Sequence, residues 1–120
     1  MVEVVTTDEF VEWYNALGEA DADAVTRSVG LLAEFGVLLG FPHSSGITGT
    51  RFALRELRVQ SKGRPLRVFY AFDPKREAVL LVGGDKTGSS DRRFYDEFIS
   101  KAEKIWIQYL AEQGFEPRGH

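Results

Sequence analysis

Cysteine is absent from this chain of 120 residues, and histidine occurs only at His43 and His120. The lack of cysteine excludes disulfide bonds, thiol nucleophiles and cysteine-ligated zinc, and it is consistent with a cytoplasmic protein. Two histidines so far apart argue against a His-based metal site and against a catalytic triad driven by histidine. We therefore expect a protein without a bound metal or cofactor.

Long apolar segments are also missing. The sequence has no run of about 18 apolar residues that would suit a membrane span, and its N-terminus lacks the pattern of a secretory signal. Hydrophobic residues make up 43% of the chain and charged residues 28%, which are ordinary values for a globular protein. The sequence therefore predicts a single domain over residues 1–120 that does not associate with a membrane.

Charge is distributed unevenly along the chain. Residues 51–93 contain 11 Lys and Arg against 5 Asp and Glu, whereas the remaining residues contain 4 against 13. The basic segment also carries the clearest strand patterns, so the positive charge is expected on a sheet. A sheet surface with a positive electrostatic field is a candidate binding site for a phosphate-bearing partner. A solvated face without a binding role is the alternative that charge alone leaves open.

Hydrophobic periodicity and helix-capping residues predict the element order β-α-α-β-β-β-α. Thr7 can cap the first helix, and Gly83 and Gly84 are expected to end the last strand. The expected fold is an α+β domain, with an N-terminal helical hairpin and a C-terminal helix on one face of a small, mostly antiparallel sheet. Strands are predicted at residues 2–5, 54–60, 66–73 and 78–82, helices at 8–17, at about 21–40 and at 91–113, loops at 43–50 and 61–65, and a tail after residue 114.

The two strands of the expected hairpin separate apolar from basic side chains. In the second strand, Arg67 and Phe69 lie opposite an apolar face made by Leu66, Val68, Tyr70 and Phe72. Arg58 has the corresponding position in the first strand, beside Glu56, which we expect to pair with a neighbouring arginine and orient it. Arg67 is thus predicted to be exposed, so its replacement by alanine should change stability by no more than about 0.5 kcal/mol.

These basic residues suit RNA as a ligand and as a substrate. Arginine binds phosphate bidentately, and Phe69 on the same face could stack against a base or ribose. RNA carries its own nucleophile, the 2′-hydroxyl, so cations that stabilise the transition state and a tyrosine that moves a proton could suffice for cleavage. The candidate catalytic residues are Arg58, Arg67, Lys86 and Tyr95, and the candidate RNA-binding residues are Lys62, Arg64, Phe69, Arg92 and Arg93.

Four short motifs in order resemble the RelE/HigB toxins of type II toxin–antitoxin pairs, and most closely the branch described as phage-derived Gp49-like proteins. The motifs are Leu39-Gly40-Phe41-Pro42, Leu54-Arg55-Glu56-Leu57-Arg58, Leu66-Arg67-Val68-Phe69-Tyr70-Ala71-Phe72-Asp73 and Leu80-Leu81-Val82-Gly83-Gly84-Asp85-Lys86-Thr87. The resemblance implies a RelE-like fold that agrees with the pattern analysis. It also implies cleavage of mRNA on the ribosome, and control by an antitoxin that carries a helix-turn-helix.

The resemblance extends to the site. It implies that Arg58 and Arg67 lie on the active strand face, that Lys86 matches a basic residue after the last strand, and that Tyr95 matches a late tyrosine. The net charge of −3 departs from the basic character usual in RelE-type toxins, and Lys86 stands beside Asp85 rather than beside a second cation. A toxin-fold binder without nuclease activity, either a gyrase-type inhibitor or an antitoxin-pairing protein, is therefore the alternative function.

Overall fold

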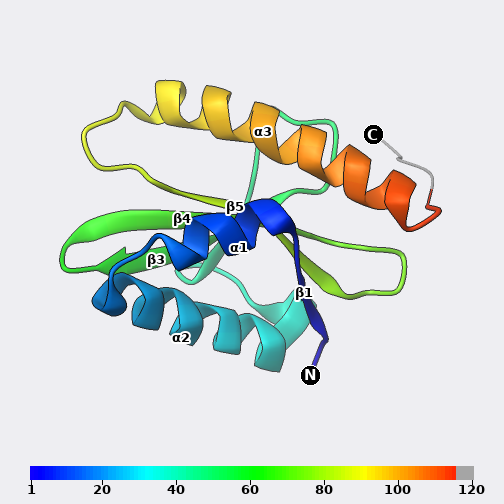
Figure 1. Ribbon diagram of the computed structural model, residues 1–120, viewed down its shortest axis with the longest axis horizontal. Coiled ribbons are helices and arrows are strands. Elements are labelled where there is room, and N and C mark those ends of the chain that lie inside the picture. Colours follow the sequence, from blue (N-terminus) through cyan, green and yellow to red (C-terminus); the bar gives the residue numbers. More distant parts are fainter. Residues whose placement is uncertain (116–120) are drawn as a thin grey trace.

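A five-stranded sheet forms the centre of the structure, a computed structural model that describes residues 1–115 (Figure 1). The predicted tail beyond residue 115, including His120, lies outside the described residues. The strands follow the spatial order β1-β5-β4-β3-β2, and only β1 runs parallel to its neighbour. The elements are β1 (Val4–Thr6), α1 (Asp8–Asn15), α2 (Glu19–Phe35), a 3₁₀ turn (Gly36–Leu38), β2 (Ser44–Gly46), β3 (Arg55–Ser61), β4 (Arg64–Phe72), β5 (Ala78–Asp85) and α3 (Asp91–Glu112).

The α+β class and the mostly antiparallel sheet are confirmed, and the differences from the predicted elements have local causes. Thr7 caps α1 as predicted, because its hydroxyl accepts a hydrogen bond of 3.2 Å from the Phe10 amide. The loop between β3 and β4 shortens to two residues, Lys62 and Gly63, because both adopt the positive φ that a tight hairpin turn requires. Part of the expected loop at 43–50 forms β2 by pairing with β3.

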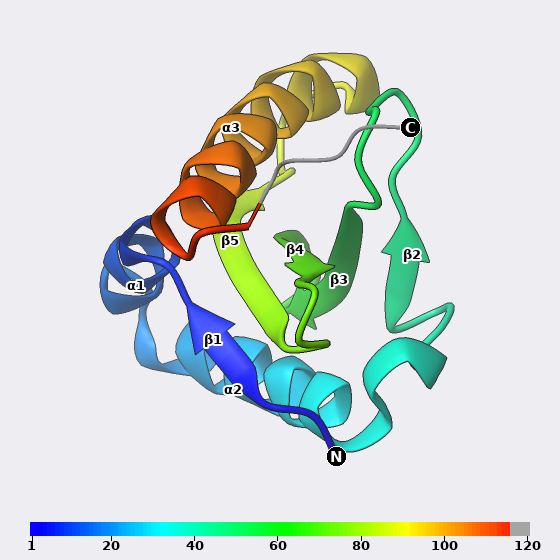
Figure 2. The same cartoon turned by 90° about the vertical axis from the view of Figure 1, so that its right-hand side faces the viewer.

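The helices cover both faces of the sheet, so the prediction that they share one face is wrong. Figure 2 shows α1 and α2 on one side of the curved sheet and α3 on the other. The side of β4 that carries Arg67 also presents Phe69 and Ala71, which are apolar, and α3 buries them. The end of this face nearest the start of α3 carries Arg58, Arg67 and Glu56, and at the opposite end the buried Asp73 accepts a hydrogen bond from Tyr109 of α3. In residues 1–115, no helix is long and apolar enough to cross a membrane.

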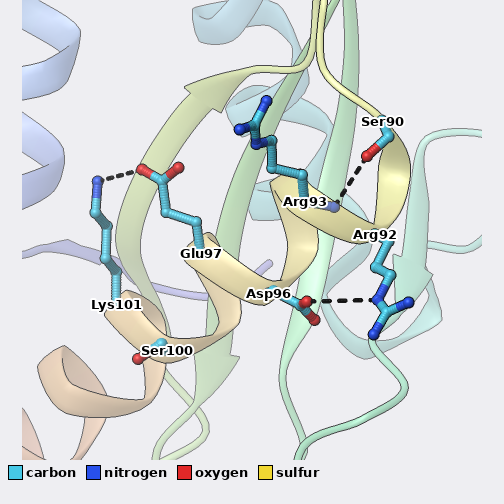
Figure 3. A pocket seen from close by; sticks show the side chains of 7 residues that line it. All are labelled: Ser90, Arg92, Arg93, Asp96, Glu97, Ser100 and Lys101. Carbon is cyan, nitrogen blue, oxygen red and sulfur yellow. Dashed lines mark hydrogen bonds and ion pairs between the residues drawn. The ribbon is translucent and has the colours of Figure 1, made fainter.

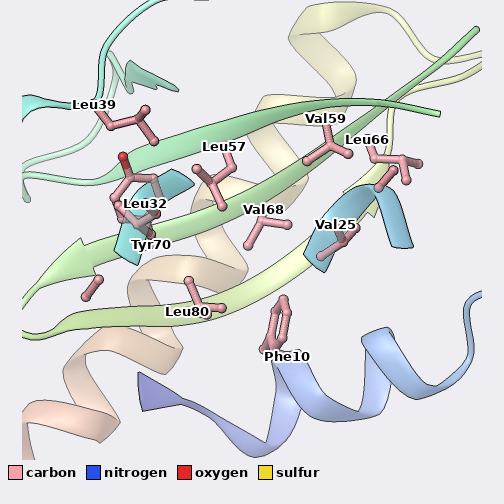
Figure 4. Packing of buried hydrophobic residues seen from close by; sticks show 12 residues of the cluster. Phe10, Val25, Leu32, Leu39, Leu57, Val59, Leu66, Val68, Tyr70 and Leu80 are labelled. Carbon is pink, nitrogen blue, oxygen red and sulfur yellow. The ribbon is translucent and has the colours of Figure 1, made fainter. Parts of the chain in front are cut away.

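Each face of the sheet has its own hydrophobic cluster. The first cluster joins α1 and α2 to the sheet (Figure 4), and its buried residues are Phe10, Ala24, Val25, Leu32, Leu39, Leu57, Val59, Leu66, Val68, Tyr70, Ala78 and Leu80. The second cluster joins α3 to the sheet through Phe52, Leu54, Phe69, Ala71, Val79, Leu81, Phe94, Ala102, Trp106 and Leu110. A sheet that is buried between two layers of helices needs apolar side chains on both of its faces.

Strand β5 continues through Gly83 and Gly84 to Asp85, where the sequence predicted a break. A β-bulge shifts the register from Tyr70–Leu80 to Phe69–Val82, and the strand beyond it therefore presents Gly83 and Gly84 to opposite faces. The Trp13 ring of α1 occupies the space beside Gly83, and the Phe98 ring of α3 occupies the space beside Gly84. The two glycines let one helix approach each face of the strand.

We expect Gly84→Ala to destabilise the fold by roughly 1–3 kcal/mol, the usual cost of overpacking. A Cβ at Gly84 would lie 2.5 Å from Cζ of Phe98, so the ring or helix α3 must move. Denaturant unfolding measures the loss. A second substitution, Phe98→Leu, should recover part of it by vacating the space. Full stability of the single Gly84→Ala variant would contradict this close approach.

Candidate active site

Glu56 lies at the centre of the polar end of the sheet face that α3 covers. Its side chain is buried, and three groups contact its two carboxylate oxygens. The Tyr95 hydroxyl donates a hydrogen bond of 2.6 Å to Oε1. Arg67 Nε lies 3.5 Å from the same oxygen, and Arg58 Nη1 lies 3.4 Å from Oε2. The predicted pairing of Glu56 with a neighbouring arginine is present, and two arginines take part in it.

Arg58 and Arg67 face each other across β3 and β4, where two like charges would destabilise the sheet without a counterion. Glu56 lies against both guanidinium groups and supplies that counterion. The two arginines differ in access, since 30% of the Arg58 side chain is exposed and only 5% of the Arg67 side chain. The expected exposed position of Arg67 is therefore wrong, because α3 and Glu56 cover it.

The Arg67 guanidinium is only partly satisfied. Its Nη1 donates to the Leu66 carbonyl oxygen at 3.0 Å. Its Nε makes an ion-pair contact with Glu56 but has no hydrogen-bond partner within residues 1–115. A buried cation in this state raises the positive potential around Glu56 and Tyr95. Arg67 itself is buried, so it influences a bound ligand through its effect on Glu56 and Tyr95.

Tyr95 lies in the first turns of α3 and contacts Glu56 from the side of the sheet that α3 covers. Burial of the phenol and its hydrogen bond to Glu56 raise the pKa of Tyr95 to about 12. The hydroxyl therefore holds its proton at neutral pH and is a donor. Its ring packs edge-on against Phe94 at a centroid separation of 5.2 Å, which fixes the direction of the hydroxyl.

Lys86 follows the end of β5 and reaches the same cluster. Its Nζ lies 5.1 Å from the centre of the Tyr95 ring and 2.9 Å from Oδ1 of Asp91. The hydrogen bond from Lys86 lowers the pKa of Asp91, so this carboxylate is ionised at neutral pH. The structure thus brings together the four predicted catalytic residues, Arg58, Arg67, Lys86 and Tyr95, with two carboxylates among them. Their catalytic roles stay predictions.

An open hollow beside Glu56 and Tyr95 gives a ligand access to the cluster. Its volume is about 410 Å³, and its walls come from the loop after β2 and the start of α3, with Gly46, Thr48, Gly49, Asp91, Arg92 and Ile99 among the lining residues. The charged side chains in these walls are the three carboxylates Glu56, Asp91 and Asp96 and one cation, Arg92. The hollow is large enough for one nucleotide, in the size range of small-molecule sites.

The predicted RNA-binding cations do not form one surface. Arg92 borders the hollow and is almost fully exposed, and its Nε lies 3.9 Å from Asp96. Arg93 lies on the outer side of α3, in a shallow depression that only α3 and its N-cap residue Ser90 line (Figure 3). Lys101 and Glu97 pair there at 2.9 Å, so local charges largely compensate one another.

The hairpin cations lie apart from the cluster around Glu56. Lys62 is exposed at the tip of the turn. Arg64 pairs with Asp21 of α2 and, at 2.6 Å, with Asp85, so it ties the hairpin to the helical side. Hydrogen bonds from Ser61 and Arg64 lower the pKa of Asp21, so this carboxylate is ionised at neutral pH and its ion pair with Arg64 is maintained. These contacts give Arg64 a structural role, and its predicted role in RNA binding stays a prediction.

Phe69 is inaccessible, so its predicted stacking against a base or ribose is wrong for this structure. The side chain is fully buried. Its ring stacks on Phe98 of α3 at a centroid separation of 5.9 Å and an interplanar angle of 9°. The alternation of β4 placed Phe69 correctly on the face of Arg67, but it could not reveal that α3 covers this face.

Glu56 is the residue whose importance sequence patterns understated. The parity of β3 indicated its face and its arginine partner, but its contact with Tyr95 spans 39 residues of sequence. In residues 1–115, no group of three or more His, Cys, Asp or Glu side chains is placed to hold a metal ion.

Comparisons with known proteins agree on one family. The family model described as "Phage derived protein Gp49-like (DUF891)" matches residues 12–106. "Putative toxin HigB3" of Mycobacterium tuberculosis is 34% identical over 111 residues, which cover 92% of this chain and 95% of that protein. "Putative toxin HigB2" of the same organism is 35% identical over 102 residues, which cover 83% of this chain. The chain spans only 50% of the length of HigB2.

A solved structure shows the same fold at low sequence identity. A mutant of the toxin RelE from E. coli with two arginines replaced by alanine, in its free state, superposes with a TM-score of 0.61 at 12% identity. The match covers 86% of this chain and 95% of that RelE chain. At that identity the likeness concerns the fold alone, whereas the family model and the two HigB proteins establish kinship by sequence. The chain therefore belongs to the Gp49-like family of RelE/HigB-type toxins.

Proposed function

We propose that this protein is the toxin of a type II toxin–antitoxin pair and that it cleaves mRNA on the ribosome, in the cytoplasm. One observation carries the proposal: a protonated Tyr95 is hydrogen-bonded to the buried Glu56, between the cations Arg58, Arg67 and Lys86. Proton donor, proton acceptor and positive charge are the three elements that RNA cleavage by its own 2′-hydroxyl requires.

The proposed reaction is an in-line transfer. The 2′-oxygen attacks the neighbouring phosphorus, its proton passes to the Glu56 carboxylate, and the bond from phosphorus to the 5′-oxygen breaks. Tyr95 donates its proton to that leaving oxygen, and the products are a 2′,3′-cyclic phosphate and a 5′-hydroxyl. The proton that Glu56 accepted then passes to the Tyr95 oxygen, to which Glu56 is hydrogen-bonded, and this restores both groups. Arg58 and Lys86 stabilise the charge that gathers on the phosphoryl oxygens. Arg67 balances the charge of Glu56 and orients its carboxylate, which is a positioning role.

An antitoxin is the partner that family membership implies, and a helix-turn-helix antitoxin is the proposed type. A non-enzymatic function, such as a gyrase-type inhibitor or a protein that only pairs with its antitoxin, is the competing proposal. The net charge of −3 supports it, because a negative protein is repelled by ribosomal RNA. Two carboxylates within the cluster also reduce the positive charge available to RNA.

Expression without an antitoxin tests the proposal. We expect growth arrest with a block in translation, and cleavage of mRNA in purified ribosomes that carry a message. Arg58→Ala is the matched inactive control. Because Arg58 is partly exposed, the variant should fold like the parent protein but should not arrest growth. Normal growth at high soluble expression would refute the toxin function. Arrest with intact mRNA and impaired DNA supercoiling would instead establish the gyrase-type alternative.

A further inference from the structure

Phe41 is the most conspicuous exposed aromatic side chain near the candidate active site. Its side chain is 77% exposed, although phenylalanine usually lies in the interior. The turn that carries it is anchored by hydrogen bonds of 3.0 Å from the His43 amide to the Gly40 carbonyl and of 2.9 Å from the Arg58 amide to the His43 carbonyl. The ring is therefore presented to solvent from a fixed backbone.

Arg58 connects this ring to the cluster. Its Cζ lies 5.2 Å from the centre of the Phe41 ring, within the range of a cation–π contact. The same guanidinium lies 3.4 Å from Glu56. An exposed aromatic face and a partly exposed cation thus lie next to each other at the edge of the group that is proposed to cleave RNA. Unpaired nucleobases stack on such faces while cations hold the adjoining phosphates.

We propose that Phe41 and Arg58 form a platform on which an unpaired base next to the cleaved phosphate stacks. This inference rests on the proposed function and adds a positioning residue to it. Phe41 replaces Phe69 as the stacking residue, because Phe69 is buried under α3. The Phe41 ring carries no acid, base or charge that could take part in bond cleavage, so its role is to hold the substrate and it should affect KM more than kcat.

The guanidinium over the Phe41 ring favours RNA over an apolar protein surface as the occupant of this platform. Phe35 is the other exposed aromatic side chain within residues 1–115, and no cation lies over its ring. A purely apolar docking surface would have no need of a guanidinium on one of its rings. The pairing with Arg58 is specific to Phe41, and it suits a ligand with both a base and a phosphate.

The test compares Phe41→Ala with Phe41→Trp and with the control Leu38→Ala, whose side chain is 85% exposed. The probe is a short unpaired oligoribonucleotide with a 2′-deoxy group at the cleavage position, so that binding is measured without cleavage. We expect Phe41→Ala to weaken binding about tenfold and to raise KM for ribosome-bound mRNA similarly, with kcat little changed. Phe41→Trp should restore both values, and Leu38→Ala should alter neither.

Three results would overturn the platform. Unchanged RNA affinity and KM in Phe41→Ala, while Arg58→Ala loses both, would reject the platform and leave the proposed function standing. Equal losses in Phe41→Ala and Leu38→Ala would indicate a general apolar surface rather than a base-stacking residue. Weakened antitoxin binding with intact RNA binding would assign Phe41 to a protein interface. Failure of the parent protein to cleave mRNA would instead refute the proposed function itself.

Discussion

Arg67→Ala is expected to destabilise the protein by ~2–3 kcal/mol and to slow RNA cleavage by ~10²-fold or more. The stability loss arises because Glu56 is buried against Arg67. Truncating Arg67 removes one of the cations that compensate the Glu56 carboxylate, which water cannot reach in its place. This is far more than the roughly 0.5 kcal/mol of an exposed site. The cleavage loss arises because Glu56 loses its orientation. Chemical denaturation and single-turnover cleavage measure the two effects.

Two variants separate these effects. Arg58→Ala removes a cation from the same carboxylate at a more exposed position, so it should cost less stability than Arg67→Ala. Combining Arg67→Ala with Glu56→Ala should cost less than the sum of the two single substitutions, because the uncompensated charge is then absent. An Arg67→Ala variant that unfolds at the parental denaturant concentration would contradict the buried ion pair. One that cleaves at the parental rate would contradict the positioning role.

Tyr95→Phe is expected to lower the cleavage rate by ~10²–10⁴-fold, the range for loss of one general acid, with a stability cost of ~1 kcal/mol. The substitution keeps the ring and its packing against Phe94 and removes only the hydroxyl that bonds Glu56. An acid works only while protonated. Since its pKa is raised to about 12, Tyr95 should support cleavage up to about two pH units above an unperturbed tyrosine of pKa 10.

Tyr109 provides the matched control for Tyr95. Burial and the nearby Asp73 carboxylate raise its pKa to about 12 as well, and its hydroxyl donates to Asp73 at 3.3 Å. It lies near the other end of α3, away from Glu56. Tyr109→Phe should therefore leave single-turnover cleavage and its alkaline pH profile unchanged. Equal rate losses in the two variants, or parental activity in Tyr95→Phe, would remove Tyr95 from the proposed chemistry.

Local sequence patterns determined much of the scaffold. The cap at Thr7, the period-2 alternation of β4 and the periodicity of α3 each depend on residues within one element, so they could be recognised without a fold. The same alternation placed Arg58, Arg67 and Glu56 on one face of the β3–β4 hairpin. Residues that share a face through strand parity can be read from spacing, since the pleat has a fixed period.

Only the tertiary structure decided what that face contacts. Helix α3 crosses it, buries Phe69 and Arg67, and brings Tyr95 to Glu56 across 39 residues of sequence. Gly83 and Gly84 look like strand breakers in sequence, but they continue β5 because Trp13 and Phe98 fill the space of their absent side chains. Such contacts depend on which layer packs against which, and burial and charge pairing between distant elements leave no periodic signal in the chain.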